Sequence, residues 1–75
     1  MVYTTTPPKN PKPPTAKDIA ALQLIADGKT QQEAATILGI TERSFYNRIH
    51  RMRWKYRKTS TVHLIAEAVR KEWID

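Results

Sequence analysis

The chain has 75 residues, and its 13 Lys and Arg against 7 Asp and Glu give a net charge of +6. The absence of cysteine excludes disulfides and thiolate metal sites, and two histidines cannot assemble a structural zinc site unaided. No apolar run approaches the roughly 18 residues that cross a bilayer, and residues 1–12 lack the apolar core of a secretory signal. We expect one small intracellular domain with no metal or cofactor, whose basic excess favours a polyanionic partner.

All five prolines lie within residues 1–14. Because proline fixes φ and lacks an N–H group, this segment can form neither a helix interior nor a central strand. We predict a flexible, disordered Pro-rich arm at residues 1–14 and one folded domain at residues 15–75. The arm carries Lys9 and Lys12, so it is interpreted either as a simple tail or as a basic arm that touches DNA.

The folded region is predicted to be helical from its first residue. Thr15 followed by Asp18 is typical of a helix start, and Gly28 can take the positive φ that ends a helix. Between them, four apolar residues recur at helical spacing: Ile19, Leu22, Ile25 and Ala26. The first helix is therefore expected over residues 16–27.

The second helix is marked at both ends. Thr30-Gln31-Gln32-Glu33 is a capping box, in which the Thr hydroxyl and the Glu carboxylate bind amides reciprocally, and Gly39 is the expected stop. Its predicted buried face consists of Ala34, Ala35, Ile37 and Leu38.

Two longer helices complete the prediction. Thr41 caps a third helix over residues 42–57, and Ser60 caps a fourth over residues 61–73. The apolar stripe of the third helix is Phe45, Ile49, Met52 and Tyr56, and that of the fourth is Val62, Ile65, Val69 and Trp73. The chain shows no strand-like alternation, so we predict an all-α domain of four helices.

The short turn Gly39-Ile40-Thr41 between the second and third helices is typical of a helix-turn-helix unit, although other small helical bundles contain tight Gly turns. The charge of the third helix also favours the helix-turn-helix interpretation. Residues 43–58 hold seven Lys and Arg, one His and no acid, whereas a solvated helix face normally mixes both signs. The pattern therefore favours nucleic acid as the partner.

On a helical wheel, polar side chains of the third helix lie opposite the Phe45 stripe. Arg suits guanine edges and Asn suits adenine edges, and only the first three turns of such a helix lie deep in a groove. The base-reading candidates are Arg43, Tyr46, Asn47, His50 and Arg51. The basic residues interpreted as general electrostatic contacts are Arg53, Lys55, Arg57 and Lys58.

The run GKTQQEAATILGITERSFYNR at residues 28–48 resembles the DNA-binding domain of LuxR/GerE-type transcription regulators, whose pattern is approximately G-x-[ST]-x-x-E-I-A-x-x-L-G-I-[ST]-x-x-[ST]-V-x-x-H. The resemblance extends from Thr15 into the fourth helix. It implies a four-helix domain whose third helix enters the major groove and whose fourth helix dimerises. It places phosphates at Thr30, Gln31 and Ser44 and base contacts at Tyr46, Asn47 and His50. Gln32 and Arg48 are further candidates for phosphate contacts. The implied dimer contacts are Leu64, Glu67, Ala68 and Lys71, and for Leu64 and Ala68 packing at the margin of the core is the alternative interpretation.

Four residues depart from that pattern. Arg48 replaces a common His, Arg53 replaces an apolar residue, and Trp54 stands on the polar face, where it either packs on a basic stem or contacts a partner. Arg57 stands where Gly usually ends the recognition helix, so that helix is expected to run longer or to end in a different way. These departures bear on the base contacts and the dimer geometry.

The leading hypothesis is a dimeric, sequence-specific regulator of transcription that binds double-stranded DNA, of bacterial or phage origin, cytoplasmic and nucleoid-associated. The alternative is a module like sigma-factor region four or a phage adaptor, whose main contact is RNA polymerase or another protein. An enzyme is not expected, because no nucleophile–base set, Gly-rich phosphate loop or paired carboxylates are present.

Overall fold

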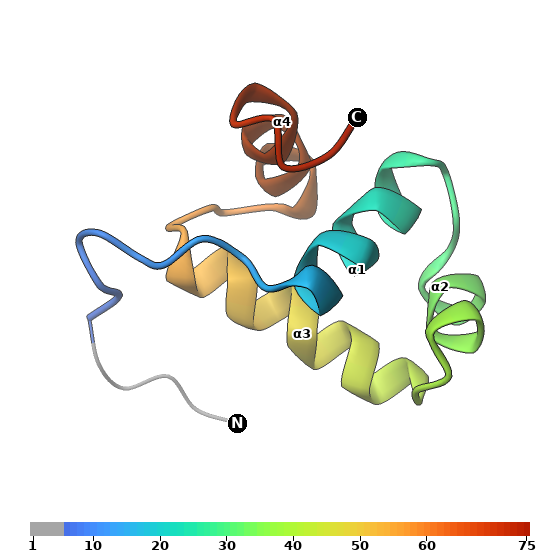
Figure 1. Ribbon diagram of the computed structural model, residues 1–75. Coiled ribbons are helices and arrows are strands. Elements are labelled where there is room, and N and C mark those ends of the chain that lie inside the picture. The colour runs from blue at the N-terminus through green and yellow to red at the C-terminus, as the bar shows by residue number, and fades with distance from the viewer. Residues whose placement is uncertain (1–5) are drawn as a thin grey trace.

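The computed structural model describes residues 6–75, which form four helices and no strand (Figure 1). The helices are α1 (Ala16–Ala26), α2 (Gln31–Leu38), α3 (Glu42–Lys55) and α4 (Thr61–Arg70). In Figure 1, α1 lies over the middle of α3, α2 lies at the beginning of α3, and α4 lies above α3 at the top of the view. The predicted all-α, four-helix architecture is confirmed. None of these helices is long and apolar enough to cross a membrane.

Each helix begins after a hydroxyl side chain that accepts a hydrogen bond from the amide three residues later. The caps are Thr15, Thr30, Thr41 and Ser60. At α1 and α2 the bond is returned, because Asp18 and Glu33 accept from the amides of Thr15 and Thr30 at 3.2 and 2.9 Å. All four predicted helix starts are therefore confirmed.

All four helices end in the same way, with one residue of positive φ followed by an amide that reaches back five residues. Gly28 and Gly39 supply this conformation after α1 and α2, with φ of 91° and 72°. Arg57 and Glu72 supply it after α3 and α4, with φ of 58° and 60°. The reaching bonds are Lys29 to Leu24, Ile40 to Ala35, Lys58 to Arg53 and Trp73 to Ala68, at 2.7–3.0 Å.

The two non-glycine ends correct the predicted helix lengths. The third helix was expected to reach residue 57 and stops at Lys55, and the fourth was expected to reach residue 73 and stops at Arg70. Since Arg and Glu seldom adopt positive φ, neither stop has a signal in the sequence. The turn at Glu72 brings Trp73 and Ile74 back toward the core, where Ile74 is buried.

The core lies between α1, α3 and α4, with α2 contributing two alanines. Its largest fully buried side chains are Phe45, Leu22 and Leu64. The remaining buried members are Ala21, Ala34, Ala35, Ile49, Met52, Ala68 and Ile74. The predicted α3 stripe is confirmed, since Tyr56 also packs against this cluster. In the shorter helices Ala26 and Ile37 were expected to be buried and are exposed.

The predicted buried face of α4 is wrong in two of its four members, since Ile65 and Trp73 do pack against the core. Val62 and Val69 are 76% and 50% exposed, whereas Leu64 and Ala68 have no exposed surface. Apolar residues occur on several sides of this helix, and packing against α1 and α3 selects the Leu64 side. Leu64 and Ala68 were expected to form dimer contacts, and their burial inside one chain leaves them no surface to offer a second copy.

Residues 6–14, called the arm below, run beside the C-terminal half of α3 (Figure 1). The Tyr56 hydroxyl donates to the carbonyl of Lys12 at 2.7 Å, and the Arg57 guanidinium donates to the carbonyl of Pro7 at 2.9 Å. Pro14 is buried. An extended proline-rich segment leaves its carbonyls unpaired, so it can accept these bonds. Residues 6–14 are therefore extended and bonded to the end of α3 at two points. The flexibility of the arm stays a prediction, and its part at residues 1–5 lies outside the described residues.

Candidate nucleic-acid interface

A short, fully bonded turn fixes α3 relative to α2. Gly39 takes the left-handed conformation that L side chains rarely adopt, and the amide of Ile40 then donates to the carbonyl of Ala35 at 3.0 Å. Ile40 packs against the core, and Thr41 starts α3 at once by accepting from the amide of Ser44 at 3.0 Å. No loop residue is left to change the angle between the two helices.

Three polar side chains form a line along the outer face of the first turns of α3. Arg43, Asn47 and Arg51 follow one another at intervals of four residues, which places them on one side of a helix; we call them the α3 ridge. Arg43 and Arg51 are exposed and Asn47 is half-buried. Within residues 6–75, no side-chain hydrogen bond or ion pair engages these three residues. Their donors and acceptors therefore face solvent, available to a ligand.

Tyr46 and His50 form a second feature beside the ridge. Their rings stack with centroids 5.8 Å apart and an angle of 15° between planes, and Tyr46 is 50% exposed. His50 is half-buried and lines a pocket of about 130 Å³ together with Gln31 and Thr61. The structure thus brings the predicted base-reading pair together, with Tyr46 as its more exposed member.

The predicted phosphate contacts Thr30, Gln31, Gln32 and Ser44 lie at the starts of α2 and α3. Gln31 and Gln32 are exposed in the first turn of α2, where unpaired amides and the helix dipole attract anions. Thr30 is occupied by the capping box with Glu33. At the start of α3, the hydroxyl of Ser44 accepts from that of Thr41 at 2.9 Å.

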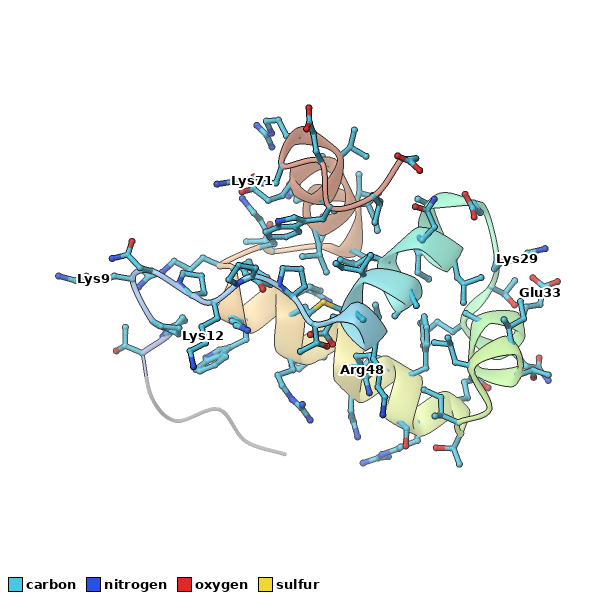
Figure 2. The ribbon with its side chains drawn as sticks, in the orientation of Figure 1. Lys9, Lys12, Lys29, Glu33, Arg48 and Lys71 are labelled. Carbon is cyan, nitrogen blue, oxygen red and sulfur yellow. The ribbon has the colours of Figure 1, made fainter. Side chains whose placement is uncertain are left out.

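Four basic residues that were predicted to contact phosphate are instead used inside the protein. Arg48 pairs with Asp18 at 2.8 Å and so joins α3 to α1 (Figure 2). Arg53 donates to the carbonyl of Thr59 at 2.6 Å, and Arg57 donates to that of Pro7. Lys58 pairs with Glu67 on α4 at 3.4 Å. These contacts hold the middle of α3 to α1, and its C-terminal end to α4, to the loop before α4 and to the arm.

Lys55 and Tyr56, at the same C-terminal end of α3, also make contacts inside the protein. The Lys55 ammonium lies 5.3 Å from the centre of the Tyr56 ring. Burial, and secondarily the charge of Asp18, raise the pKa of Tyr56, so its hydroxyl stays protonated and donates to the arm. Neither the Tyr56 hydroxyl nor Asp18 was predicted as functional, because each contact joins residues far apart in the sequence.

The two charged residues predicted for dimerisation are bonded to each other. Glu67 lies 3.9 Å from Lys71, and it also pairs with Lys58 and Arg70 at 3.4 Å. Glu67 is mostly buried, with 19% of its side chain exposed. It acts as the shared counter-charge of three cations in one chain, which corrects its expected role.

Residues 19–55 match the family model of the homeodomain-like domain. The match begins inside α1 and ends with the last residue of α3, so it covers most of α1, all of α2 and α3, and the turn that joins them. No curated protein matches the chain. Sequence and geometry together support a helix-turn-helix domain of the DNA-binding class, and the match does not select the LuxR/GerE type within that class.

Proposed function

We propose that the chain is a sequence-specific regulator of transcription that places α3 in the major groove of double-stranded DNA. The observation that carries this proposal is the α3 ridge: Arg43, Asn47 and Arg51 are aligned, lie in the first turns, and make no ion pair or hydrogen bond within residues 6–75. Arginines stabilising only the fold would have partners, as Arg48 and Arg53 do.

The chemistry of the ridge suits base edges. An Arg guanidinium can donate to guanine O6 and N7, and an Asn amide can both donate to and accept from adenine. The exposed first turn of α2, with Gln31 and Gln32, provides amides for a flanking phosphate. In this proposal the ridge selects the sequence, and α2 sets the position of α3 on the duplex.

Selection of bound sequences from a random DNA pool, done on the wild type and on Asn47→Ala, tests the proposal. The wild type should yield one motif, and Asn47→Ala should lose its preference at one base pair, since a bidentate pair discriminates by about 1–3 kcal/mol. Asn10→Ala removes the same side chain from the arm and should return the wild-type motif. A wild-type protein that enriches no motif contradicts the proposal, and a motif that appears only with RNA polymerase supports the adaptor alternative.

The homodimer belongs to the same proposal, with a different surface from the one predicted. Because Leu64 and Ala68 are buried, the apolar side chains that α4 offers to a second copy are Val62 and Val69. A dimer should select two copies of the motif related by a two-fold axis. Val62→Asp should then bind a single copy, as measured by sedimentation with DNA carrying one or two half-sites. An unpaired motif in the selection would remove the dimer.

A further inference from the structure

A second positively charged site lies at the other end of α3, where the arm meets α4. The arm is bonded to α3 at Pro7 and at Lys12, so residues 8–11 form a short loop held at both ends. This loop, the end of α3 and the end of α4 enclose a pocket of about 330 Å³, here called the arm pocket. Tyr56 and Trp73, whose ring centroids are 5.0 Å apart, form part of its wall.

The charge of the arm pocket is unbalanced. Lys9, Lys55, Arg57 and Lys71 line it, with Glu67 as the one acid among its lining residues. Of the four lining cations Glu67 pairs with Lys71 alone, and it shares its carboxylate with Lys58 and Arg70, so the lining keeps an excess of positive charge. Figure 2 shows Lys9 on the arm and Lys71 on α4 at the same side of the molecule. Cations gathered in this way, from three segments distant in sequence, form a site suited to an anion.

The position of the arm pocket relates it to the α3 ridge. With 14 residues α3 is about 20 Å long, whereas the major groove is about 12 Å wide. When the first turns of α3 lie in the groove, its last turn therefore reaches the sugar-phosphate backbone at the groove edge. The arm pocket lies at that last turn, since Lys55, Tyr56 and Arg57 belong to its lining.

We propose that the arm pocket binds a backbone phosphate of the DNA whose bases the α3 ridge contacts, with Lys9 and Lys71 as the principal cations. This inference rests on the proposed function. It assigns to the proline-rich arm a defined position on the duplex. It also separates two tasks: the ridge reads bases, and the arm pocket adds affinity that does not depend on sequence.

The test is the salt dependence of binding to one duplex that carries the selected motif, measured by fluorescence anisotropy of the full chain. The double variant Lys9→Ala/Lys71→Ala should lower the magnitude of the slope of log K against log salt by about 0.9, the change expected for one phosphate contact. Lys9→Ala and Lys71→Ala should each lower it by part of that amount, and none of these variants should alter the selected motif. Lys17→Ala is the matched control, since it removes an exposed lysine from α1, and it should keep the wild-type slope. Thermal melts of all variants confirm that they remain folded.

The outcomes separate this inference from the proposed function. A wild type that binds DNA specifically, with Lys9→Ala and Lys71→Ala indistinguishable from Lys17→Ala, overturns the arm pocket and leaves the function standing. A wild type that binds no DNA overturns both. Titration with inorganic phosphate, monitored by the fluorescence of Trp73 and Trp54, tests whether the arm pocket binds a small phosphorylated molecule and not the DNA backbone. Saturation by phosphate together with unchanged DNA slopes would assign the pocket to a small phosphorylated molecule and contradict the proposal.

Discussion

The two ends of α3 are both basic and are used differently. In the first turns, Arg43 and Arg51 are exposed, and apolar residues such as Phe45 hold the helix to the core from the other side. In the last turns, Arg53 bonds to the loop before α4 and Arg57, just after the helix, bonds to the arm. Burial of apolar surface holds the first end, where Arg43 and Arg51 stay available to a ligand and only Arg48 is paired, whereas Arg53 and Arg57 at the second end bond inside the protein.

This difference shows that a run of positive charge is not one functional unit. Side chains of the same type, two residues apart on one helix, have different partners because the helix turns them toward different neighbours. Arg51 faces solvent, while Arg53 is half-buried beside Thr59. Assigning all seven basic residues to DNA would overstate the size of the interface.

The largest expected effect concerns the apolar anchor of the first end. Phe45 is fully buried, so Phe45→Ala should lower the free energy of unfolding by about 3–5 kcal/mol, measured by thermal or urea denaturation. Tyr46→Ala, which changes the neighbouring and half-exposed aromatic residue, should cost less than about 1 kcal/mol. Equal losses in the two variants would mean that burial does not hold this end.

A smaller effect is expected at the second end, where Arg57 takes positive φ. Arg57→Ala and Arg57→Gly both lose the bond to Pro7, but only glycine removes the backbone strain. The glycine variant should therefore be the more stable of the two by about 1 kcal/mol in matched denaturation experiments. If alanine is as stable as glycine here, α3 does not end in the turn described.

The smallest effect concerns the cap of α2, which supports the first end. Hydrogen bonds from the amide and then the hydroxyl of Thr30 lower the pKa of Glu33 below 4.5. Because the folded-state pKa is lowered, the stabilisation is complete above 4.5 and is lost as the pH falls through the folded-state value. In an NMR pH titration, the chemical shift of the Thr30 amide should change as Glu33 becomes protonated. In the Glu33→Gln variant this change should be absent. A midpoint at or above 4.5 would contradict the capping box.

The helix starts and the turn could be predicted because their signals are local. Thr30, Glu33 and Gly39 act on residues within one turn of themselves, and the structure agrees with each. The phase of α4 could not be predicted, because Val62, Leu64 and Val69 are similar apolar residues on different sides, and only packing against α1 and α3 decides between them.

The candidate site, like the fold, was predictable only where its signal is local in the sequence. The α3 ridge follows from helical spacing alone, so the sequence indicates Arg43, Asn47 and Arg51 together. Which basic residues bond inside the protein depends on their partners, and those of Arg48 and Arg57 are Asp18 and Pro7, 30 and 50 positions away. Charge pattern by itself carries no information about such distant partners.

Matched alanine variants of Arg51 and Arg53 test the central claim most directly, because they remove the same charge from neighbouring turns. Arg51→Ala should weaken binding to the selected duplex about tenfold or more and leave the melting temperature unchanged. Arg53→Ala should lower the melting temperature and leave the affinity of the folded protein for the same duplex nearly unchanged. If Arg53→Ala weakens DNA binding as much as Arg51→Ala while the melting temperature stays constant, the two ends of α3 do not differ as described.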